Sequence, residues 1–231
     1  MFFKAATIAL LSTMAASSPT PTTSPKYPER LSSENFRLVA DVKSNDLNPS
    51  IQNYVLTSYH TGAGLAFAVL QPNETATSGR IFYANGTDED IRYGHGNVLS
   101  DEGTPLFPGG IVVNPPFPTP TPGSNPEDAE IDLSINAGVG TSGVGITRFP
   151  DQISNLYSSA GEGFYACMKD LMYGPAVLVF VKQHFVDTPK ECADVVLLPQ
   201  CSEGSGAEHP FGKPSSCYAD VAGTDWTVYH R

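Results

Sequence analysis

Acidic side chains cluster in three short stretches of the chain, at residues 88–90, 101–102 and 127–130. Glycoside hydrolases hold two carboxyl groups about 5–9 Å apart across a sugar, often on a β scaffold. One interpretation is therefore an extracellular glycan-active hydrolase that uses paired carboxylates. Acids in turns are usually solvated, however, and the sequence does not show which of them face each other. No catalytic residue is assigned.

Other patterns for chemistry are incomplete. Gly138, Gly140 and Gly143 match the spacing of a dinucleotide loop, but residues 144–150 are a poor helix opening and such a loop needs a helix there. Ser142 lacks the second glycine of a hydrolase elbow. The five histidines do not pair at the spacing of metal ligands, and no cysteine pair does so either. We therefore expect neither a metal nor a cofactor.

Aromatic residues are plentiful, with 10 Tyr, 12 Phe and 1 Trp. Carbohydrate-binding β modules use exposed aromatic rings as flat platforms for the apolar faces of sugars. The candidates that face a ligand are those in or beside predicted strands, together with a histidine before a Gly-rich turn: Tyr54, Tyr59, Tyr83, Tyr93 and His60. This interpretation favours a non-enzymatic protein that binds glycans or cell-wall material at a surface or a host contact.

The charge balance excludes two classes of partner. The 24 acidic residues outnumber the 13 basic ones and give a formal net charge of −11. Nucleic acids and anionic membrane surfaces bind through clustered Lys and Arg, so neither is an expected partner. Hydrophobic residues make up 40% of the chain, which is enough for a core.

The N-terminus has the pattern of a secretory signal peptide. Lys4 precedes a short apolar stretch, and small residues follow at 15–18, so we expect residues 1–17 to be removed. Asn73 and Asn85 both begin N-glycosylation sequons beside a predicted strand. The expected product is a secreted, extracellular glycoprotein.

The four cysteines, Cys167, Cys192, Cys201 and Cys217, indicate two disulfides in such a protein. Cys201 and Cys217 bracket a Gly- and Pro-rich segment that cannot order itself by burial, which favours a bridge across it. Cys167 would then pair with Cys192. The crossed arrangement, in which Cys167 pairs with Cys201 and Cys192 with Cys217, stays open.

Proline-rich stretches divide the chain. We expect residues 18–33 to form a disordered tail rich in Pro, Ser and Thr, and 34–231 to form one domain with a Pro-rich insertion at 114–127. About ten short apolar runs rich in β-branched residues predict strands, without the alternating helices of a parallel sheet. The runs include a hairpin at 54–70 and a strand at 176–181 that is buried on both faces. A short helix is predicted at 151–158. The fold class is all-β: an antiparallel β-sandwich or partly open barrel with long Pro/Gly-rich loops.

Three segments carry a family resemblance: F-R-L-x-A at 36–40, H-T-G-A-G at 60–64 and F-Y-x-N-G-T at 82–87. With them the chain resembles an uncharacterised family of small secreted proteins of filamentous fungi, a domain of unknown function. Residues around Cys167 and Cys192 look similar to the C-terminal half of that family. The resemblance covers roughly residues 36–201. It implies a fungal secreted protein and supplies no activity or catalytic residue.

Overall fold

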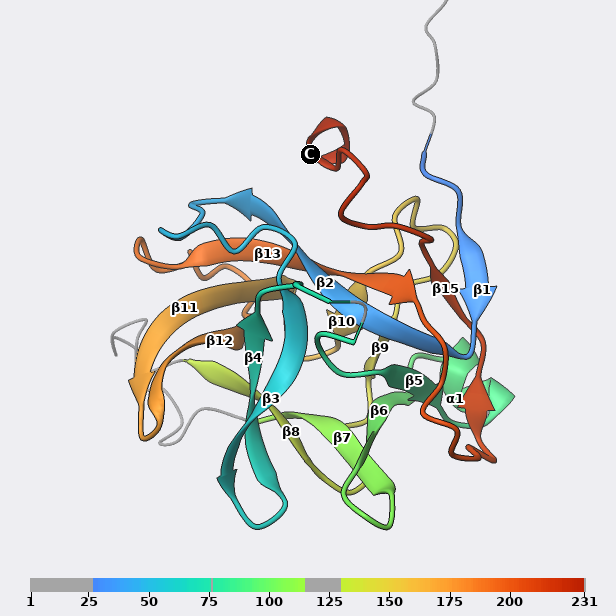
Figure 1. Cartoon of the computed structure of the whole chain (residues 1–231). Coiled ribbons are helices and arrows are strands. Elements are labelled where there is room, and N and C mark those ends of the chain that lie inside the picture. The colour runs from blue at the N-terminus through green and yellow to red at the C-terminus, as the bar shows by residue number, and fades with distance from the viewer. Residues whose placement is uncertain (1–26, 76, 115–129, 231) are drawn as a thin grey trace, which may run out of the picture.

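The computed structural model describes residues 27–75, 77–114 and 130–230, and almost all of its regular structure is β (Figure 1). The predicted signal peptide, most of the predicted tail and nearly all of the Pro-rich insertion lie outside these ranges. The described elements, in chain order, are β1 (Leu31–Ser33), β2 (Asn35–Ser44), β3 (Val55–Gly62), β4 (Leu65–Gln71), β5 (Phe82–Asn85), α1 (Asp88–Arg92), β6 (Asn97–Glu102), β7 (Phe107–Val113), β8 (Ile131–Ala137), β9 (Val144–Ile146), β10 (Leu156–Ser158), β11 (Gly163–Leu171), β12 (Gly174–Lys182), β13 (Ala193–Cys201), β14 (Gly212–Lys213), β15 (Ser215–Cys217) and the 3₁₀ helix η2 (Thr227–Tyr229).

Eleven strands form one antiparallel sheet that closes on itself. One closed circuit of pairings runs β2–β5–β6–β7–β8–β4–β3 and back to β2. A second circuit runs β2–β3–β4–β12–β11–β13 and back to β2. The hairpin of β3 and β4 therefore belongs to both circuits and stands between them at the lower left of Figure 1. This confirms the predicted all-β fold class, because the sheet is a partly open antiparallel barrel.

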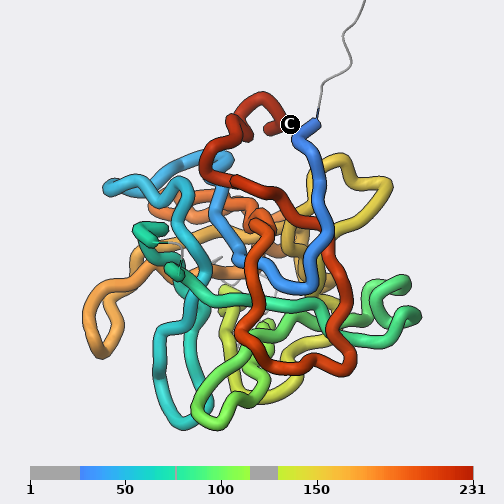
Figure 2. The backbone as a smooth tube through the Cα atoms, turned by 45° about the vertical axis from the view of Figure 1, so that its right-hand side comes forward, coloured from blue at the N-terminus to red at the C-terminus, as the bar shows by residue number. Residues whose placement is uncertain are grey.

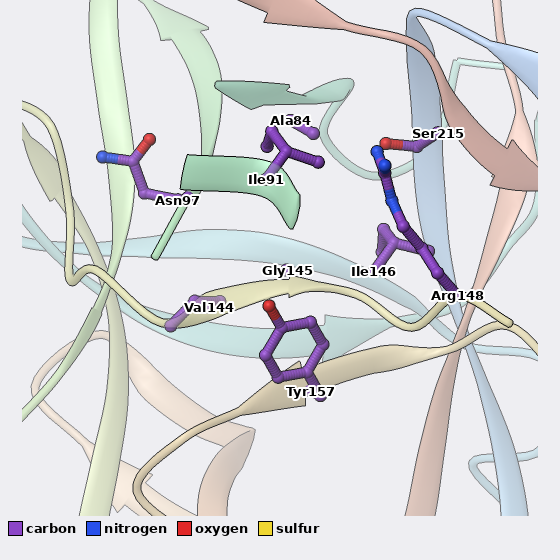
Figure 3. A pocket seen from close by; sticks show the side chains of 10 residues that line it. Ala84, Ile91, Asn97, Val144, Gly145, Ile146, Arg148, Tyr157 and Ser215 are labelled. Carbon is purple, nitrogen blue, oxygen red and sulfur yellow. The ribbon is translucent and has the colours of Figure 1, made fainter. Parts of the chain in front are cut away.

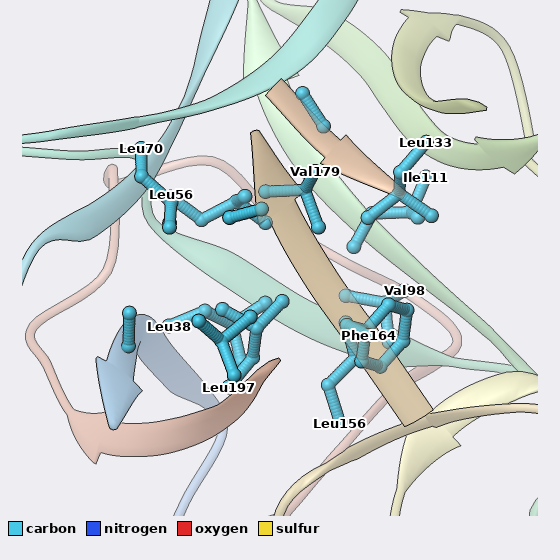
Figure 4. Close-up of a cluster of buried hydrophobic side chains, with 14 of the residues drawn as sticks. Leu38, Leu56, Leu70, Val98, Ile111, Leu133, Leu156, Phe164, Val179 and Leu197 are labelled. Atoms are coloured by element: carbon cyan, nitrogen blue, oxygen red, sulfur yellow. The ribbon is translucent and has the colours of Figure 1, made fainter. Parts of the chain in front are cut away.

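The main core fills the inside of this sheet. Along the strands of both circuits, every second side chain points into this core, because successive side chains of a strand point to opposite faces of the sheet. Figure 4 shows these side chains converging from strands that are far apart in the sequence; those labelled are Leu38, Leu56, Leu70, Val98, Ile111, Leu133, Leu156, Phe164, Val179 and Leu197. The predicted central strand is confirmed, because Val177 to Val181 of β12 are all buried.

The outer face of the sheet carries a second buried cluster under the C-terminal residues. Trp226 and Tyr218 pack there against Val39 and Val55 of β2 and β3. The trace in Figure 2 shows residues after 201 running back across the strands to end near the described start of the chain. The single domain expected from the sequence thus includes these last thirty residues in its packing.

Two disulfides hold the C-terminal third. They join Cys167 to Cys192 and Cys201 to Cys217, which is the favoured pairing rather than the crossed one. Cys201 ends β13 and Cys217 ends β15, so the second bridge closes the Gly- and Pro-rich segment onto the sheet. In the chain-entropy model a loop of this size contributes about 3 kcal/mol to stability.

The predicted helix at 151–158 is wrong. Asn155 exchanges hydrogen bonds with Thr147, since its N–H donates to the Thr147 hydroxyl and its carbonyl accepts from the Thr147 N–H. Residues 156–158 then continue as β10, which pairs with β9. The sheet thus provides the backbone partners that a helix would have supplied. The described α-helix is α1 instead, where Thr87 and Asp90 form a reciprocal capping box.

Candidate functional site

In the first circuit, β3 and β6 lie on either side of a gap and do not pair with each other. One edge of β2 pairs with β5 at residues 35–36 and with β3 at Val39, so β3 lies next to β2 and does not reach β6. The space between them is a groove of about 400 Å³, which we call the seam groove. Residues of the β3–β4 and β6–β7 hairpins line it, and these hairpins are the two loops at the bottom of Figure 1. Its lining residues are Ser58, His60, Gly64, Leu65, Ala66, Arg80, Asp101, Glu102, Gly103 and Phe107.

Arg80 bridges the two sides of the seam groove. Its Nη1 donates to Ser58 Oγ of β3 at 2.7 Å, and its Nε donates to Ser100 Oγ of β6 at 2.7 Å. Its Nη2 lies 2.8 Å from Glu102 Oε1 and donates to the Asp101 carbonyl at 3.0 Å. Burial lowers the pKa of Arg80, while the charges of Glu102 and Asp101 act in the opposite direction. The guanidinium therefore holds together two strands that share no backbone hydrogen bond.

The rim of the seam groove is apolar and accessible. Leu65 is 52% exposed and Phe107 is 41% exposed. The Phe107 ring lies against Gly103, where a Cβ would sit 2.2 Å from the ring and where φ is +70°. Only glycine fits such a position without strain. An aromatic ring thus lies in the same groove as His60, Asp101 and Glu102.

Asp101 connects the groove to the C-terminal residues. Its carboxylate lies 3.0 Å from His209 Nε2 and also accepts a hydrogen bond from the Ser205 hydroxyl. The His209 ring stacks on Tyr83, with 3.6 Å between ring centroids. Burial and then the Asp101 charge raise the pKa of Tyr83 to about 12. The carboxylates of Asp101 and Glu102 are therefore both engaged with a nitrogen partner.

The five residues predicted to face a ligand lie apart from one another. His60 is exposed and lines the seam groove. Tyr83 is only 5% exposed, because His209 covers its ring. Tyr93 is 65% exposed at the end of α1, and Tyr59 is half-buried beside Tyr173, with 6.0 Å between ring centroids. Tyr54 is half-buried against the main core. The structure therefore brings one of them, His60, to the groove.

The two predicted glycosylation sites differ in their surroundings. Asn73 lies in the connection after β4 and is half-buried. Asn85 ends β5, where its side-chain Nδ2 donates to Asn97 Oδ1 at 3.0 Å and its backbone pairs with β6 and β14. Both sites stay predictions.

Sequence reasoning missed most of the seam groove. It noted the acidic pair at 101–102 but gave no role to Arg80 or Phe107, because no spacing in the chain links them. Across the described residues, no group of three or more His, Cys, Asp or Glu side chains is arranged to hold a metal ion. In the same ranges no helix is long and apolar enough to cross a membrane.

Comparisons with known proteins show which family the chain is similar to. A family model described as a domain of unknown function (DUF7907) matches residues 33–201. The chain is also similar to a protein of Stachybotrys chartarum named antigenic protein SchS34, with 34% identity over 224 residues, covering 89% of this chain and 95% of that protein. No solved structure matches the chain.

Proposed function

The chain belongs to this fungal family of domains of unknown function, and on that premise we propose that it is a secreted binding protein of a surface or host contact that recognises glycans or cell-wall material through the seam groove. The observation that carries the proposal is the groove itself. It combines an accessible aromatic ring, Phe107, with hydrogen-bonding groups on both of its sides. Sugars present the same combination of an apolar ring face and a rim of hydroxyl groups.

Export rests on three observations. The N-terminus has a signal-peptide pattern, the described cysteines are joined in two disulfides, and a relative is named an antigenic protein. Disulfides form and persist in oxidising compartments, which is where a secreted protein folds.

Expression in a filamentous fungus tests this part of the proposal. The protein should reach the medium without its first residues, about 15–17 of them. Endoglycosidase treatment should increase its mobility on a denaturing gel, and the double variant Asn73→Gln, Asn85→Gln should abolish that shift. The two single variants report which site carries a glycan. An unglycosylated product that stays inside the cell would contradict the prediction.

Binding in the seam groove follows from complementary chemistry. The Phe107 ring offers a flat apolar surface, and His60 is exposed beside it. The Glu102 carboxylate is held in place by Arg80, so it can accept hydrogen bonds from hydroxyl groups without rearrangement. Fixed polar groups of this kind reduce the ordering cost of binding.

Substitution of the groove residues tests the binding site. Isothermal titration with soluble fungal and plant cell-wall oligosaccharides should give saturable binding, and Phe107→Ala should weaken it about tenfold, equivalent to about 1.4 kcal/mol. His60→Ala should weaken it too. Phe211→Ala is the matched control, because Phe211 is also an exposed phenylalanine, at 61%, and lies outside the groove. Equal losses in Phe107→Ala and Phe211→Ala would refute the groove as the site.

The same samples separate binding from hydrolysis. Asp101 and Glu102 both line the seam groove, which is the feature that keeps the paired-carboxylate hydrolase as the second candidate function. Release of reducing ends that depends on both carboxylates would establish that alternative. Binding without cleavage supports the proposal.

A further inference from the structure

A narrow cleft lies apart from the seam groove, between the β9–β10 hairpin and the residues around α1 (Figure 3). Its volume is about 20 Å³. One water molecule needs about 10–15 Å³ on this measure, so the cleft admits a single small group rather than a whole sugar. The polar side chains that line it are Asn97, Arg148, Tyr157 and Ser215.

Three of these side chains are hydrogen-bond donors that form no side-chain hydrogen bond with another described residue: Arg148, Tyr157 and Ser215. In Figure 3 the guanidinium of Arg148 and the hydroxyl of Ser215 lie close together, and the hydroxyl of Tyr157 lies apart from them, beside Gly145. The cleft thus gathers donors from three segments of the chain.

The position of Tyr157 is fixed by its neighbour across the hairpin. Tyr157 pairs with Gly145, where a Cβ would lie 2.8 Å from the Tyr157 ring. Glycine at 145 therefore allows the ring to lie flat across β9 with its hydroxyl in the cleft. Burial raises the pKa of Tyr157, although the charge of Arg148 acts against this, so the hydroxyl keeps its proton and remains a donor at neutral pH.

The charge of the cleft is opposite to that of the whole protein. The chain has a formal net charge of −11, and the residues that line the seam groove include Asp101 and Glu102. The cleft is lined by the guanidinium of Arg148 and by no carboxylate. A guanidinium binds carboxylate, sulfate and phosphate oxygens through parallel N–H donors, and hydroxyl donors complete such a site.

We propose that this cleft binds an oxyanion, with Arg148 as the charged partner and Tyr157 and Ser215 as neutral donors. Its size restricts the bound group to one carboxylate, sulfate or phosphate, either free or at the end of a larger molecule that stays outside the cleft. The inference is independent of glycan binding in the seam groove, since the two sites share no residue.

Anion titrations at constant ionic strength test the proposal. Sodium acetate, sulfate and phosphate are each titrated into the full-length protein, with chemical shifts of backbone amides at 144–148 as the readout. At least one of the three should bind saturably with a millimolar Kd. Arg148→Gln should weaken that binding at least tenfold, and Tyr157→Phe and Ser215→Ala should each weaken it several-fold. A preference for acetate identifies a carboxylate site, and a preference for sulfate or phosphate identifies a tetrahedral one.

Arg92→Gln is the matched control, because Arg92 is an exposed arginine outside the cleft whose guanidinium lies 5.7 Å from the centre of the Tyr93 ring. It should leave anion binding unchanged. Circular dichroism and thermal unfolding should show that each variant folds as the parent does. The proposal is overturned if none of the three anions shifts these amides up to 50 mM, a limit well above millimolar Kd values, or if Arg148→Gln and Arg92→Gln bind alike.

Discussion

Replacement of Trp226 by alanine is expected to lower the free energy of unfolding by about 3–5 kcal/mol. Trp226 lies 25 residues beyond the end of the family match, yet it is only 3% exposed. Its ring packs edge-on against Tyr218, with 4.8 Å between centroids, and its Nε1 donates to the Val221 carbonyl at 2.8 Å. Alanine would leave a large cavity over β2 and β3, and the Val221 carbonyl would keep only the hydrogen bond that the Thr224 N–H donates to it at 3.2 Å.

Urea unfolding followed by circular dichroism measures this change. Val228→Ala is the control, because Val228 lies two residues further on in η2 and is 66% exposed, so its truncation should cost under about 0.5 kcal/mol. If Trp226→Ala unfolds at the same urea concentration as the parent, the C-terminal residues are not part of the cooperative domain.

Replacement of Arg80 by methionine is the second change with a large expected effect, also about 3–5 kcal/mol. The side chains of Arg80 and Glu102 are only 18% and 16% exposed. Methionine preserves much of the volume but leaves the Glu102 carboxylate, Ser58 and Ser100 without their shared donor. Removing one member of a buried ion pair is more destabilising than removing both.

A double-mutant cycle separates the ion pair from the rest of this effect. Glu102→Gln alone and the double variant Arg80→Met, Glu102→Gln are unfolded in urea beside the single Arg80 variant. The double variant should recover part of the loss, because it no longer buries an unpaired charge. Arg92→Met, at an exposed arginine, should be near neutral. Additive losses in the cycle would show that Arg80 and Glu102 are not coupled.

Local patterns in the sequence predicted most of the longer strands and favoured the cysteine pairing that the structure shows. The alternation at 36–42 and the apolar run at 176–181 correspond to β2 and β12. The Thr-x-x-Asp capping box at 87–90 was also readable, since it is a known helix start. The acidic residues of this segment equally fit a solvated turn, which is why the sequence alone does not predict the helix.

The seam groove was not readable, because it depends on contacts between distant segments. Arg80 reaches Ser58 and Glu102 only because β2 pairs with both β3 and β5, and no periodicity along the chain reports that shared edge. Tyr83 alternates like a surface residue of its strand, but residues after 201 cover it with His209. The candidate site therefore required the tertiary structure.

The shared position of β2 has a consequence for how the molecule opens. It pairs with β13 along one edge and with β5 and β3 along the other, so both of the large circuits described above pass through it. The strands of one circuit cannot separate from those of the other without breaking backbone hydrogen bonds of β2. Local unfolding is then confined to hairpin tips and connections, and the amides of β2 exchange with solvent only when the whole domain unfolds.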